Sequence, residues 1–475
     1  MRTLVWFRGK DLRVHDHPPL LDAIAAGEVV PLFVLDPYFL APERARRLPH
    51  RIQFLLESLA ELSTTIAALG SRLIVVEGKS VEVVPRMANE WRVDRVVAHR
   101  WVEPFARERD RRVAEALRVP FILYEGETLL PPGTLRTSSG GPYSVFTPFA
   151  RAFVAAAQVA RPHPRPGPIP PLPHDIKAVE VRIPTTAQLD IERNPNLVEA
   201  GEKAARKRLG QFAKEHAAHY HHTRDQMADE DGTSRVSQDL KFGTLSAREV
   251  WHAVDDDASS PGAGAFRNEL IWREFTHSTL WDRPDVLAHP FRKEFEHFPW
   301  RTSDRDWTAW AEGTTGYPVV DAAARQLVQT GFVHNRARMI AASFLTKHLM
   351  LDYRRGEAHY MHWLTDGDWA QNNFNWQWSA GCGCDAQPWF RIFNPQLQGK
   401  KFDAEGEYVR RWVPELRALD ARWIHAPHDA PEAALKKAGV RIGKDYPAPI
   451  IDHTEARERF LSAATAHTRK ARGVV

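Results

Sequence analysis

Cysteine is almost missing from this sequence, because its 475 residues include only Cys382 and Cys384. Two thiols one residue apart cannot build a disulfide framework or supply the four thiolates of an iron–sulfur cluster. The sequence also lacks an uninterrupted apolar run of membrane-spanning length, and its opening residues, MRTLVWFRGKDL, lack the pattern of a signal peptide. These absences predict a cytoplasmic protein without a membrane anchor.

No charge of one sign dominates, since 64 Lys and Arg residues against 60 Asp and Glu residues leave a formal net charge of +4. This balance allows a nucleic-acid partner without requiring one, because only a local basic patch matters for binding. Tryptophan, by contrast, is abundant, with 16 residues. Indole rings fill protein cores, and they also stack on planar ligands and on bases.

In the first 130 residues, short apolar runs alternate with amphipathic stretches. The runs predict strands at 3–7, 29–35, 72–76, 95–98 and 121–124. The stretches predict helices at 18–26, 50–68, 81–91 and 105–117. Strands that alternate with helices of this length predict right-handed crossovers, and therefore an α/β domain with a doubly wound parallel sheet at 1–130.

The turn after the first predicted strand reads RGKDLRVHD and lacks the glycine fingerprint of a dinucleotide site. A nicotinamide-type site is therefore not expected in this domain. We expect Arg8, Asp11 and Arg13 to form a structural ion-pair network rather than a catalytic group. If the sheet binds a ligand, the crevice at the carboxyl edge of its strands is the expected place.

Seven prolines in RPHPRPGPIPPLP, at 161–173, predict a stiff, extended connector inside a linker at 131–195. From about Asn196 onward helical periodicity replaces strand alternation, which predicts an all-α domain at 196–475. A basic, histidine-rich stretch at 203–224 opens this domain. Its histidines lack a carboxylate or cysteine in standard ligand spacing, so we expect no metal site there.

Two segments of the helical half carry groups suited to a polar, planar ligand. The turn GTSRVS at 232–237 offers hydroxyls and backbone N–H groups that suit a diphosphate, and a plain helix N-cap is the alternative. In NELIWREF, Glu269, Trp272 and Arg273 lie three and four residues apart and share one helix face. The alternative for this segment is an indole in the core beside charges on a solvated edge.

The segment HNRARM repeats this kind of pattern. Asn335 and Met339 are expected to share a helix face suited to a nucleobase, while Arg336 and Arg338 project elsewhere. Arg338 is also a candidate partner for Asp366.

The most unusual stretch, 366–378, reads DGDWAQNNFNWQW. It lacks the apolar spacing of a core helix and combines hydrogen-bonding groups with redox-capable indoles. We expect it to contact a ligand, and an exposed turn followed by an aromatic interface is the alternative.

In this order, the segments closely resemble the photolyase/cryptochrome family, and within it the class I cyclobutane pyrimidine dimer photolyases. The likeness spans nearly the whole chain and includes WFRGKDLRVHDHPPL, GTSRVS, NELIWREF, GYPVVDAAARQL, HNRARMIAASFL, DGDWAQNN and RIFNPQLQGKKFD. The resemblance implies a Rossmann-like antenna domain joined to a helical domain that holds FAD.

Residue by residue, the resemblance implies that the phosphate and ribitol side of FAD contacts the 220–237 region and Arg273, and that the ribose and isoalloxazine contact the 366–368 loop. The matching residues are Tyr220, Thr233, Ser234, Arg235, Val236, Ser237, Arg273, Arg338, Asp366, Gly367, Asp368 and Asn372. Arg338 would pair with Asp366. Asn372 would face the flavin N5, where photolyases typically carry an amide, plant-type cryptochromes an aspartate and insect-type ones a cysteine. An amide at this place accepts or donates only a hydrogen bond.

The resemblance also implies a lesion pocket of Glu269, Trp272, Asn335 and Met339. Trp272 would stack on a flipped-out dimer and Glu269 would hydrogen-bond the base edges. Flipping a dimer costs less than flipping a normal base, because its stacking and pairing are already damaged.

Three further residues, Arg224, Arg336 and Gln398, would meet the DNA backbone, which makes binding salt-dependent. The (6-4) photolyases place His-His where this chain has His334 and Asn335, so the cyclobutane lesion is favoured.

The implied mechanism is light-driven electron transfer from fully reduced, anionic FAD to the dimer, followed by ring splitting and return of the electron. The protein supplies orientation and electrostatics while the cofactor does the hard chemistry. We expect a monomer that binds UV-damaged DNA. A signalling photoreceptor and a (6-4) enzyme are the rival functions, and the short basic segment after Asp452 disfavours signalling.

Two departures from the family pattern concern details. Trp376 and Trp300 match the proximal and distal members of a three-tryptophan photoreduction chain, but the middle position is Tyr353, so the path is expected to slow or to detour through Trp363 or Trp369. The folate-type antenna pattern has an Asn-Glu pair where this chain has Phe105 and Ala106. A folate antenna is therefore doubtful, and a deazaflavin, a second flavin or no antenna remain open.

Overall fold

The computed structural model describes residues 1–178, 180–254 and 260–471. They belong to two compact units. Unit 1 comprises Met1–His221, Ser234–Pro284 and Thr365–Gly367, and unit 2 comprises His222–Thr233, Asp285–Leu364 and Asp368–Val475. Unit 1 thus extends beyond the predicted α/β domain into the first helices of the predicted helical half.

A five-stranded parallel sheet forms the frame of unit 1, in the order β3-β2-β1-β4-β5. Its strands are β1 Arg2–Phe7, β2 Glu28–Leu35, β3 Ile74–Glu77, β4 Arg95–His99 and β5 Phe121–Tyr124. In the central strand, Thr3 pairs with Val29 of β2 on one side and with Arg95 of β4 on the other. The predicted parallel, doubly wound sheet is confirmed.

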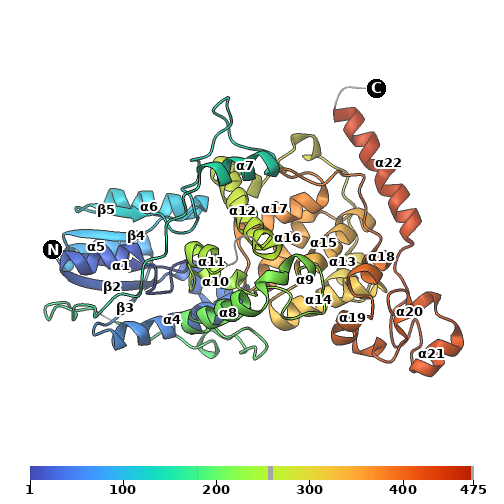
Figure 1. Cartoon of the computed structure of the whole chain (residues 1–475), viewed down its shortest axis with the longest axis horizontal. Coiled ribbons are helices and arrows are strands. Elements are labelled where there is room, and N and C mark those ends of the chain that lie inside the picture. Colours follow the sequence, from blue (N-terminus) through green and yellow to red (C-terminus); the bar gives the residue numbers. More distant parts are fainter. Residues whose placement is uncertain (179, 255–259, 472–475) are drawn as a thin grey trace. The chain divides into compact units, whose positions relative to one another are not determined.

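Helices cover both faces of this sheet, as Figure 1 shows. Successive side chains of a strand point to opposite faces. Val5 and Phe7 accordingly join one buried cluster with α1 and α4, while Leu4 and Trp6 join a second cluster with α5 and α6. Four of the helices around the sheet are α1 Pro18–Ala26, α4 Pro49–Ala68, α5 Ser80–Glu90 and α6 Pro104–Ala116.

The rest of unit 1 is helical or extended. The proline-rich segment at 161–173 contains neither helix nor strand, as predicted for a connector. Two short helices, α2 Pro37–Leu40 and α3 Pro42–Ala45, lie between β2 and β3. The helices that follow the sheet are α7 Phe146–Ala156, α8 Glu202–Glu215, α9 Tyr220–Thr223, α10 Ser237–Phe242, α11 Ala247–His252 and α12 Pro261–Asp282. Residues of α8, α11 and α12 share one apolar cluster with Tyr220 and Val236.

Among the described residues of unit 2, the regular elements are helices, joined by loops, and the β-structure is limited to two isolated bridges. Its helices are α13 Asp304–Glu312, α14 Pro318–Thr330, α15 Asn335–Ser343, the π-helix η5 Phe344–His348, α16 Tyr353–Trp363, α17 Trp369–Ala380, α18 Pro395–Phe402, α19 Glu407–Trp412, α20 Ala421–Ile424, α21 Glu432–Ala438 and α22 His453–Ala471. One large core unites α14, α15, η5, α17 and α19. The all-α second half expected from its periodicity is confirmed.

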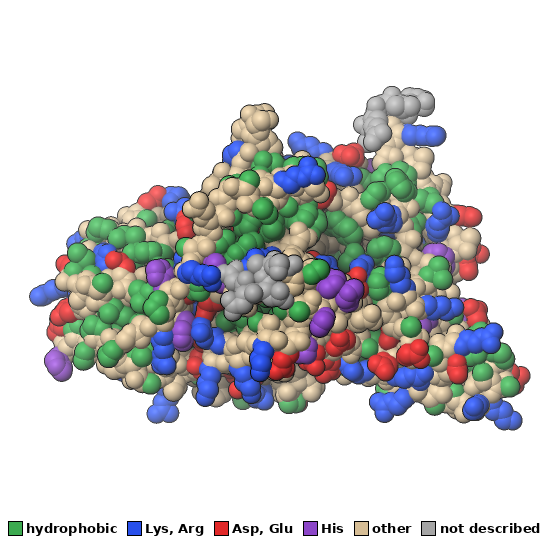
Figure 2. All heavy atoms as spheres, viewed as in Figure 1, with side chains coloured by type: hydrophobic (Ala, Val, Ile, Leu, Met, Phe, Trp, Pro, Cys, Tyr) green, Lys and Arg blue, Asp and Glu red, His purple; other side chains and the backbone are tan. Residues whose placement is uncertain are grey.

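Among the described residues, no helix combines the length and apolarity needed to cross a membrane. Basic and acidic side chains of the described residues are interspersed on the face shown in Figure 2. Any nucleic-acid contact therefore depends on local groups rather than on the net charge of the chain.

Candidate functional site

The hydroxyl-rich turn at 232–237, before α10, has an unusual backbone conformation that leaves N–H groups available to a ligand. Arg235 adopts a left-handed conformation with φ 52°, which is uncommon for a residue with a side chain. Such conformations cost on the order of 1–3 kcal/mol and cluster at ligand sites. The N-cap residue of α10 is Val236, which makes no side-chain cap. The first N–H groups of α10, together with the hydroxyls of Thr233, Ser234 and Ser237, are thus suited to an anionic group.

The predicted helix face of NELIWREF is confirmed, because Glu269, Trp272 and Arg273 all lie on α12. Arg273 is buried, and its Nη1 donates to the carbonyl oxygen of Glu127 at 2.7 Å. Its Nε is buried without a hydrogen-bond partner among the described residues. Trp272 is half-buried and stacks on Phe146, with ring centroids 3.5 Å apart and 5° between the planes. The indole is thus neither plain core nor fully exposed.

Three more expected FAD contacts, Tyr220, Asp366 and Gly367, belong to unit 1. Tyr220 is buried between the rings of Phe212 and Phe266, with centroids 5.9 and 5.5 Å away. The loop carrying Asp366 and Gly367 is tied to the α/β part of the unit, since Arg51 of α4 donates to the carbonyl oxygen of Gly367 at 3.2 Å.

From Asp368, where unit 2 resumes, the stretch DGDWAQNNFNWQW forms the start of a helix rather than an exposed turn. Asp368 is the N-cap of α17, and its Oδ1 accepts from the N–H groups of Ala370 and Gln371 at 3.0 and 3.1 Å. Asn372, one turn on, is buried, and its Nδ2 donates to the carbonyl oxygen of Glu357 at 3.0 Å. This bond holds the amide of Asn372 in a defined orientation.

The side chain of Glu357 is bound to the same helix. Asn373 Nδ2 donates to Glu357 Oε1 at 3.1 Å and also to the carbonyl oxygen of Val286 at 3.0 Å. Burial raises the pKa of Glu357 to about 7, although the bond from Asn373 opposes the shift. A carboxyl group that titrates near neutral pH therefore lies beside Asn372.

The α15 segment confirms one expectation and corrects another. Asn335 and Met339 share a face, with Asn335 Nδ2 3.9 Å from Met339 Sδ. Arg336 was expected to project elsewhere, but its Nη1 is 3.8 Å from the same sulfur. That expectation is wrong because the long arginine side chain reaches along the helix to the residue three positions on.

The charge of Arg336 is partly neutralised within unit 2. Its Nη2 lies 2.8 Å from Asp225 Oδ1, and its guanidinium stands over the ring of Phe402 at 4.4 Å. Arg338 Nε donates to the carbonyl oxygen of Val333 at 2.7 Å. Its expected pairing with Asp366 joins residues assigned to different units and stays a prediction.

Arg224 and Gln398, the remaining expected DNA contacts, are both half-buried in unit 2. Two exposed apolar side chains near Gln398 were missed by the sequence reasoning. Leu397 and Phe390 are each 61% exposed. The sequence could have indicated them, since both apolar residues lie close to the basic residues of the segment RIFNPQLQGKK, which is expected to contact DNA.

The predicted photoreduction residues lie in the core of unit 2. The rings of Trp300 and Tyr353 meet at 6.4 Å, and Tyr353 is buried. Trp376 packs against α16, because a Cβ on Gly356 would lie only 2.2 Å from its Cη2. Trp376 also contacts Trp310, with centroids 6.0 Å apart. The sequence reasoning proposed Trp363 and Trp369 for a detour and missed Trp310.

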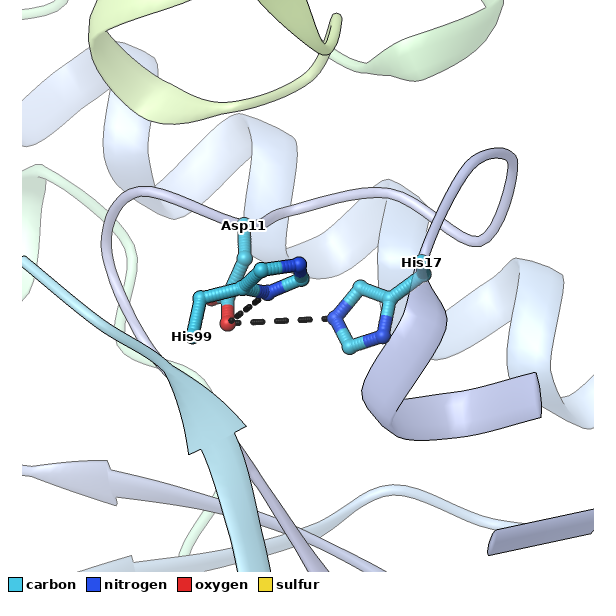
Figure 3. A group of neighbouring side chains, drawn as sticks. All are labelled: Asp11, His17 and His99. Atoms are coloured by element: carbon cyan, nitrogen blue, oxygen red, sulfur yellow. Dashed lines mark hydrogen bonds and ion pairs between the residues drawn. The ribbon is translucent and has the colours of Figure 1, made fainter. Parts of the chain in front are cut away.

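A second group of interest is a buried Asp–His–His cluster in unit 1, shown in Figure 3. Asp11 follows β1, His99 ends β4 and His17 precedes α1. Asp11 Oδ2 lies 3.3 Å from His99 Nδ1 and 3.8 Å from His17 Nε2. All three side chains are almost completely buried.

The hydrogen bonding of this cluster disfavours a metal ion. The N–H of Leu20 donates to His17 Nδ1 at 3.1 Å, so a neutral His17 ring carries its proton on Nε2, the atom that faces Asp11. A metal ligand needs a lone pair at that atom. Burial lowers the pKa of His17 and lowers that of His99 to about 3, so both rings are neutral at pH 7. The cluster is therefore interpreted as structural: it connects the segment after β1 and the end of β4 to the start of α1.

The cluster also corrects the expected network of Arg8, Asp11 and Arg13. Arg8 pairs with Asp110, with its Nη1 2.8 and 2.9 Å from the two carboxylate oxygens. Arg13 donates to the carbonyl oxygens of Gly243 and Asp16. Asp11 Oδ1 does accept from the backbone N–H of Arg8 at 2.6 Å, but the guanidinium groups of Arg8 and Arg13 bind Asp110 and backbone carbonyl oxygens instead of Asp11.

At this carboxyl edge lies a partly exposed aromatic group. The ring of Tyr38 stacks at 23° on that of Phe105, with centroids 5.9 Å apart, and Phe39 contacts both rings. Trp101 packs edge-on against Phe105, and its Nε1 is buried without a hydrogen-bond partner within the described part of the chain. Aromatic side chains therefore gather at the edge of the sheet where a ligand was expected, if the sheet binds one.

Comparison with known proteins assigns both halves of the chain. Residues 3–170 match the family model of DNA photolyase, and residues 266–466 match that of the FAD binding domain of DNA photolyase. The deoxyribodipyrimidine photo-lyase of Agrobacterium fabrum is 40% identical over 475 residues, which cover 98% of each chain.

Solved structures agree with this assignment. A bacterial class III photolyase from Agrobacterium tumefaciens is 38% identical with a TM-score of 0.91, and 98% of each chain is covered. A cryptochrome from Synechocystis is 30% identical with a TM-score of 0.90, covering 97% of this chain and 99% of that one. The motifs suggested class I, whereas the Agrobacterium tumefaciens structure is described as a class III photolyase. The class of this chain therefore stays a prediction. The chain belongs to the DNA photolyase family.

Proposed function

We propose that this protein is a light-dependent DNA repair lyase that uses FAD to split cyclobutane pyrimidine dimers in UV-damaged DNA. The observation that carries the proposal is the half-buried indole of Trp272, backed by Phe146 and placed one helix turn from Glu269 on α12. The names of the relatives, deoxyribodipyrimidine photo-lyase, support the same activity. A planar platform beside a hydrogen-bond acceptor suits a base taken out of the helix stack.

The residues present fit FAD. The turn ending at Ser237 has N–H groups without a side-chain cap, together with hydroxyls, and these suit a diphosphate. The buried hydroxyl of Thr365, next to Asp366 in the sequence, has no hydrogen-bond partner among the described residues, so a bound ligand could supply one. The residues proposed to hold the cofactor are Tyr220, Thr233, Ser234, Arg235, Val236, Ser237, Arg273, Arg338, Asp366, Gly367, Asp368 and Asn372.

Bound in its reduced, anionic form, FAD would supply light-driven electron-transfer chemistry for opening the ring of the dimer. The chain's own residues prepare this event. Trp272 would stack on the lesion, and Glu269 would accept hydrogen bonds from its base edges. Asn335 and Met339 are further proposed contacts of the lesion. Asn372, held by the carbonyl oxygen of Glu357, offers an amide that forms hydrogen bonds without supplying a proton.

DNA is held by local contacts. Arg224, Arg336 and Gln398 would meet the DNA backbone, and the exposed side chains of Phe390 and Leu397 lie in the same part of the sequence as Gln398. Because Arg336 already pairs with Asp225, DNA must compete for its charge. We infer that the protein acts as a monomer in the cytoplasm.

A second pigment is supported by the aromatic group of Tyr38, Phe39 and Phe105 at the carboxyl edge of the sheet. The stacking rings suit a planar chromophore, and the lack of the Asn-Glu pair at 105–106 disfavours a folate. Extraction of the purified protein and chromatography of the released pigments tests this point. Release of a folate contradicts the proposal.

The deciding experiment illuminates the reduced protein with an oligonucleotide that contains a thymine dimer and follows the absorbance of intact thymine. Light-dependent recovery is expected, and it should be lost in Trp272→Ala and Glu269→Ala variants that retain FAD. Stacking on an aromatic side chain contributes about 1–3 kcal/mol per base, so Trp272→Ala should weaken dimer binding roughly 5- to 150-fold. No recovery with FAD bound contradicts the proposal, and repair of a (6-4) lesion instead supports the rival enzyme.

A further inference from the structure

The contact between Phe146 and Trp272 has an unusual geometry. Their rings lie face to face, with centroids 3.5 Å apart and planes within 5° of parallel. Aromatic pairs prefer offset or edge-to-face arrangements, because the faces of two rings repel each other electrostatically. A full sandwich therefore has to be held in place by the surrounding packing.

The surroundings of the two rings supply that packing. Phe275 meets both of them edge-on, with its centroid 5.9 Å from Phe146 and 6.1 Å from Trp272. Phe149, one turn further along α7, packs on Phe275 at 5.1 Å. Phe146 is 8% exposed and starts α7, which lies against α12. The phenyl ring thus has little freedom to slide off the indole.

A ring has two faces, and Phe146 covers one face of Trp272. A base that stacks on Trp272 must therefore use the opposite face. An indole held by a second ring also loses less rotamer freedom when a ligand binds, which favours affinity through preorganisation.

We propose that Phe146 is a positioning residue for the lesion, which fixes the plane of Trp272 and selects the face on which a flipped-out pyrimidine dimer stacks. This inference rests on the proposed function. It assigns a role to a residue that lies inside the segment expected to be a linker and that touches neither the dimer nor FAD in the proposal.

The test compares two positions on the same helix. Phe146→Leu removes the planar face behind Trp272, whereas Phe149→Leu removes a ring that packs on Phe275 and is itself more deeply buried, at 2% exposed. Dissociation constants are measured for an oligonucleotide with a thymine dimer and for the same oligonucleotide undamaged, on FAD-loaded protein. The FAD content and the thermal midpoint are recorded for every variant.

Phe146→Leu should lower the ratio of dimer affinity to undamaged-DNA affinity about five- to tenfold, because the indole of Trp272 is then no longer held in its plane and must be ordered when the dimer binds. Phe149→Leu should lower the thermal midpoint and keep the ratio. Phe146→Tyr, which keeps the ring, should restore it. If Phe146→Leu fails to hold FAD, Phe146→Met provides the same comparison with a larger side chain that has no planar face.

An unchanged ratio in the folded Phe146 variants, or an equal fall in Phe149→Leu, overturns the positioning role. Failure of the proposed function looks different. In that case the parent protein itself does not discriminate the dimer from undamaged DNA, and no Phe146 variant can change a ratio that is already one.

Discussion

The ring of Tyr353 meets the ring of Trp300 edge-on in the core of unit 2, with centroids 6.4 Å apart and 71° between the planes. Tyr353 is 2% exposed, and the guanidinium of Arg354 stands over its ring at 5.0 Å. A cation over the ring disfavours a positive charge on it. Burial and, second, the nearby thiol of Cys382 raise the pKa of the Tyr353 phenol, so loss of its proton in the dark is also disfavoured.

Replacing Tyr353 by Trp should therefore speed photoreduction of oxidised FAD. Indole can be oxidised without giving up a proton at once, whereas a phenol must usually release its proton. The rate is measured as the decay of oxidised FAD absorbance under constant illumination with an external reductant. Tyr353→Phe is the control, because it keeps the ring and removes the hydroxyl. Equal rates in Tyr353→Trp and in the parent would show that the electron path bypasses position 353.

Trp310 offers such a bypass, since its ring contacts Trp376 at 6.0 Å and Trp307 at 5.5 Å. Trp307 is half-buried, so this pair leads from the core towards the surface of unit 2. Trp310→Phe should slow photoreduction by severalfold, while repair by protein that is already chemically reduced should stay unchanged. Trp363→Phe is the comparison, and a larger effect there would place the detour at the residue suggested by the sequence alone.

The sequence predicted the fold more closely than the contacts of the site. The strand positions in unit 1 came out within two residues of those observed, because buried apolar runs and turn residues are local signals. The face of α12 that carries Glu269 and Trp272 was also predictable, because helix spacing alone brings these residues together.

Contacts between segments that are distant in the sequence could not be predicted from local patterns. Asp11 and His99 are 88 residues apart and meet only because β1 and β4 are adjacent parallel strands that end at the same edge. Phe146 lies on a single short helix in a segment whose prolines predicted a linker. Trp310 has the spacing of an ordinary core residue on α13, so nothing in the sequence distinguished it as a neighbour of Trp376.

Glu357 should make the stability of the protein depend on pH. Its folded pKa of about 7 lies above the ordinary value of 4.5, so the folded state binds more protons than the unfolded state between these values. Stability should then fall as pH rises through this window. Glu357→Gln removes the titration and still accepts from Asn373. The variant should be more stable than the parent at pH 8, by at most about 3 kcal/mol, and equal to it near pH 4.5. An identical offset at both pH values, in thermal or urea unfolding of FAD-loaded protein, would contradict this account.

The Asp11–His17–His99 cluster should act in the opposite direction. Burial, followed by repulsion from His17 when that ring is protonated, lowers the pKa of His99 to about 3, below the ordinary 6.5. The unfolded state therefore binds more protons than the folded state between pH 3 and 6.5, and stability should fall as pH drops through this window, by at most about 5 kcal/mol. His99→Asn keeps an N–H donor for Asp11 but does not titrate, so its unfolding midpoint should decline less than that of the parent between pH 7 and 4. His174→Asn, a change at an exposed histidine, is the control and should follow the parent curve. If His99→Asn and the parent lose stability in parallel, the acid sensitivity arises elsewhere, and the cluster is not the group whose protonation opens this edge of the sheet.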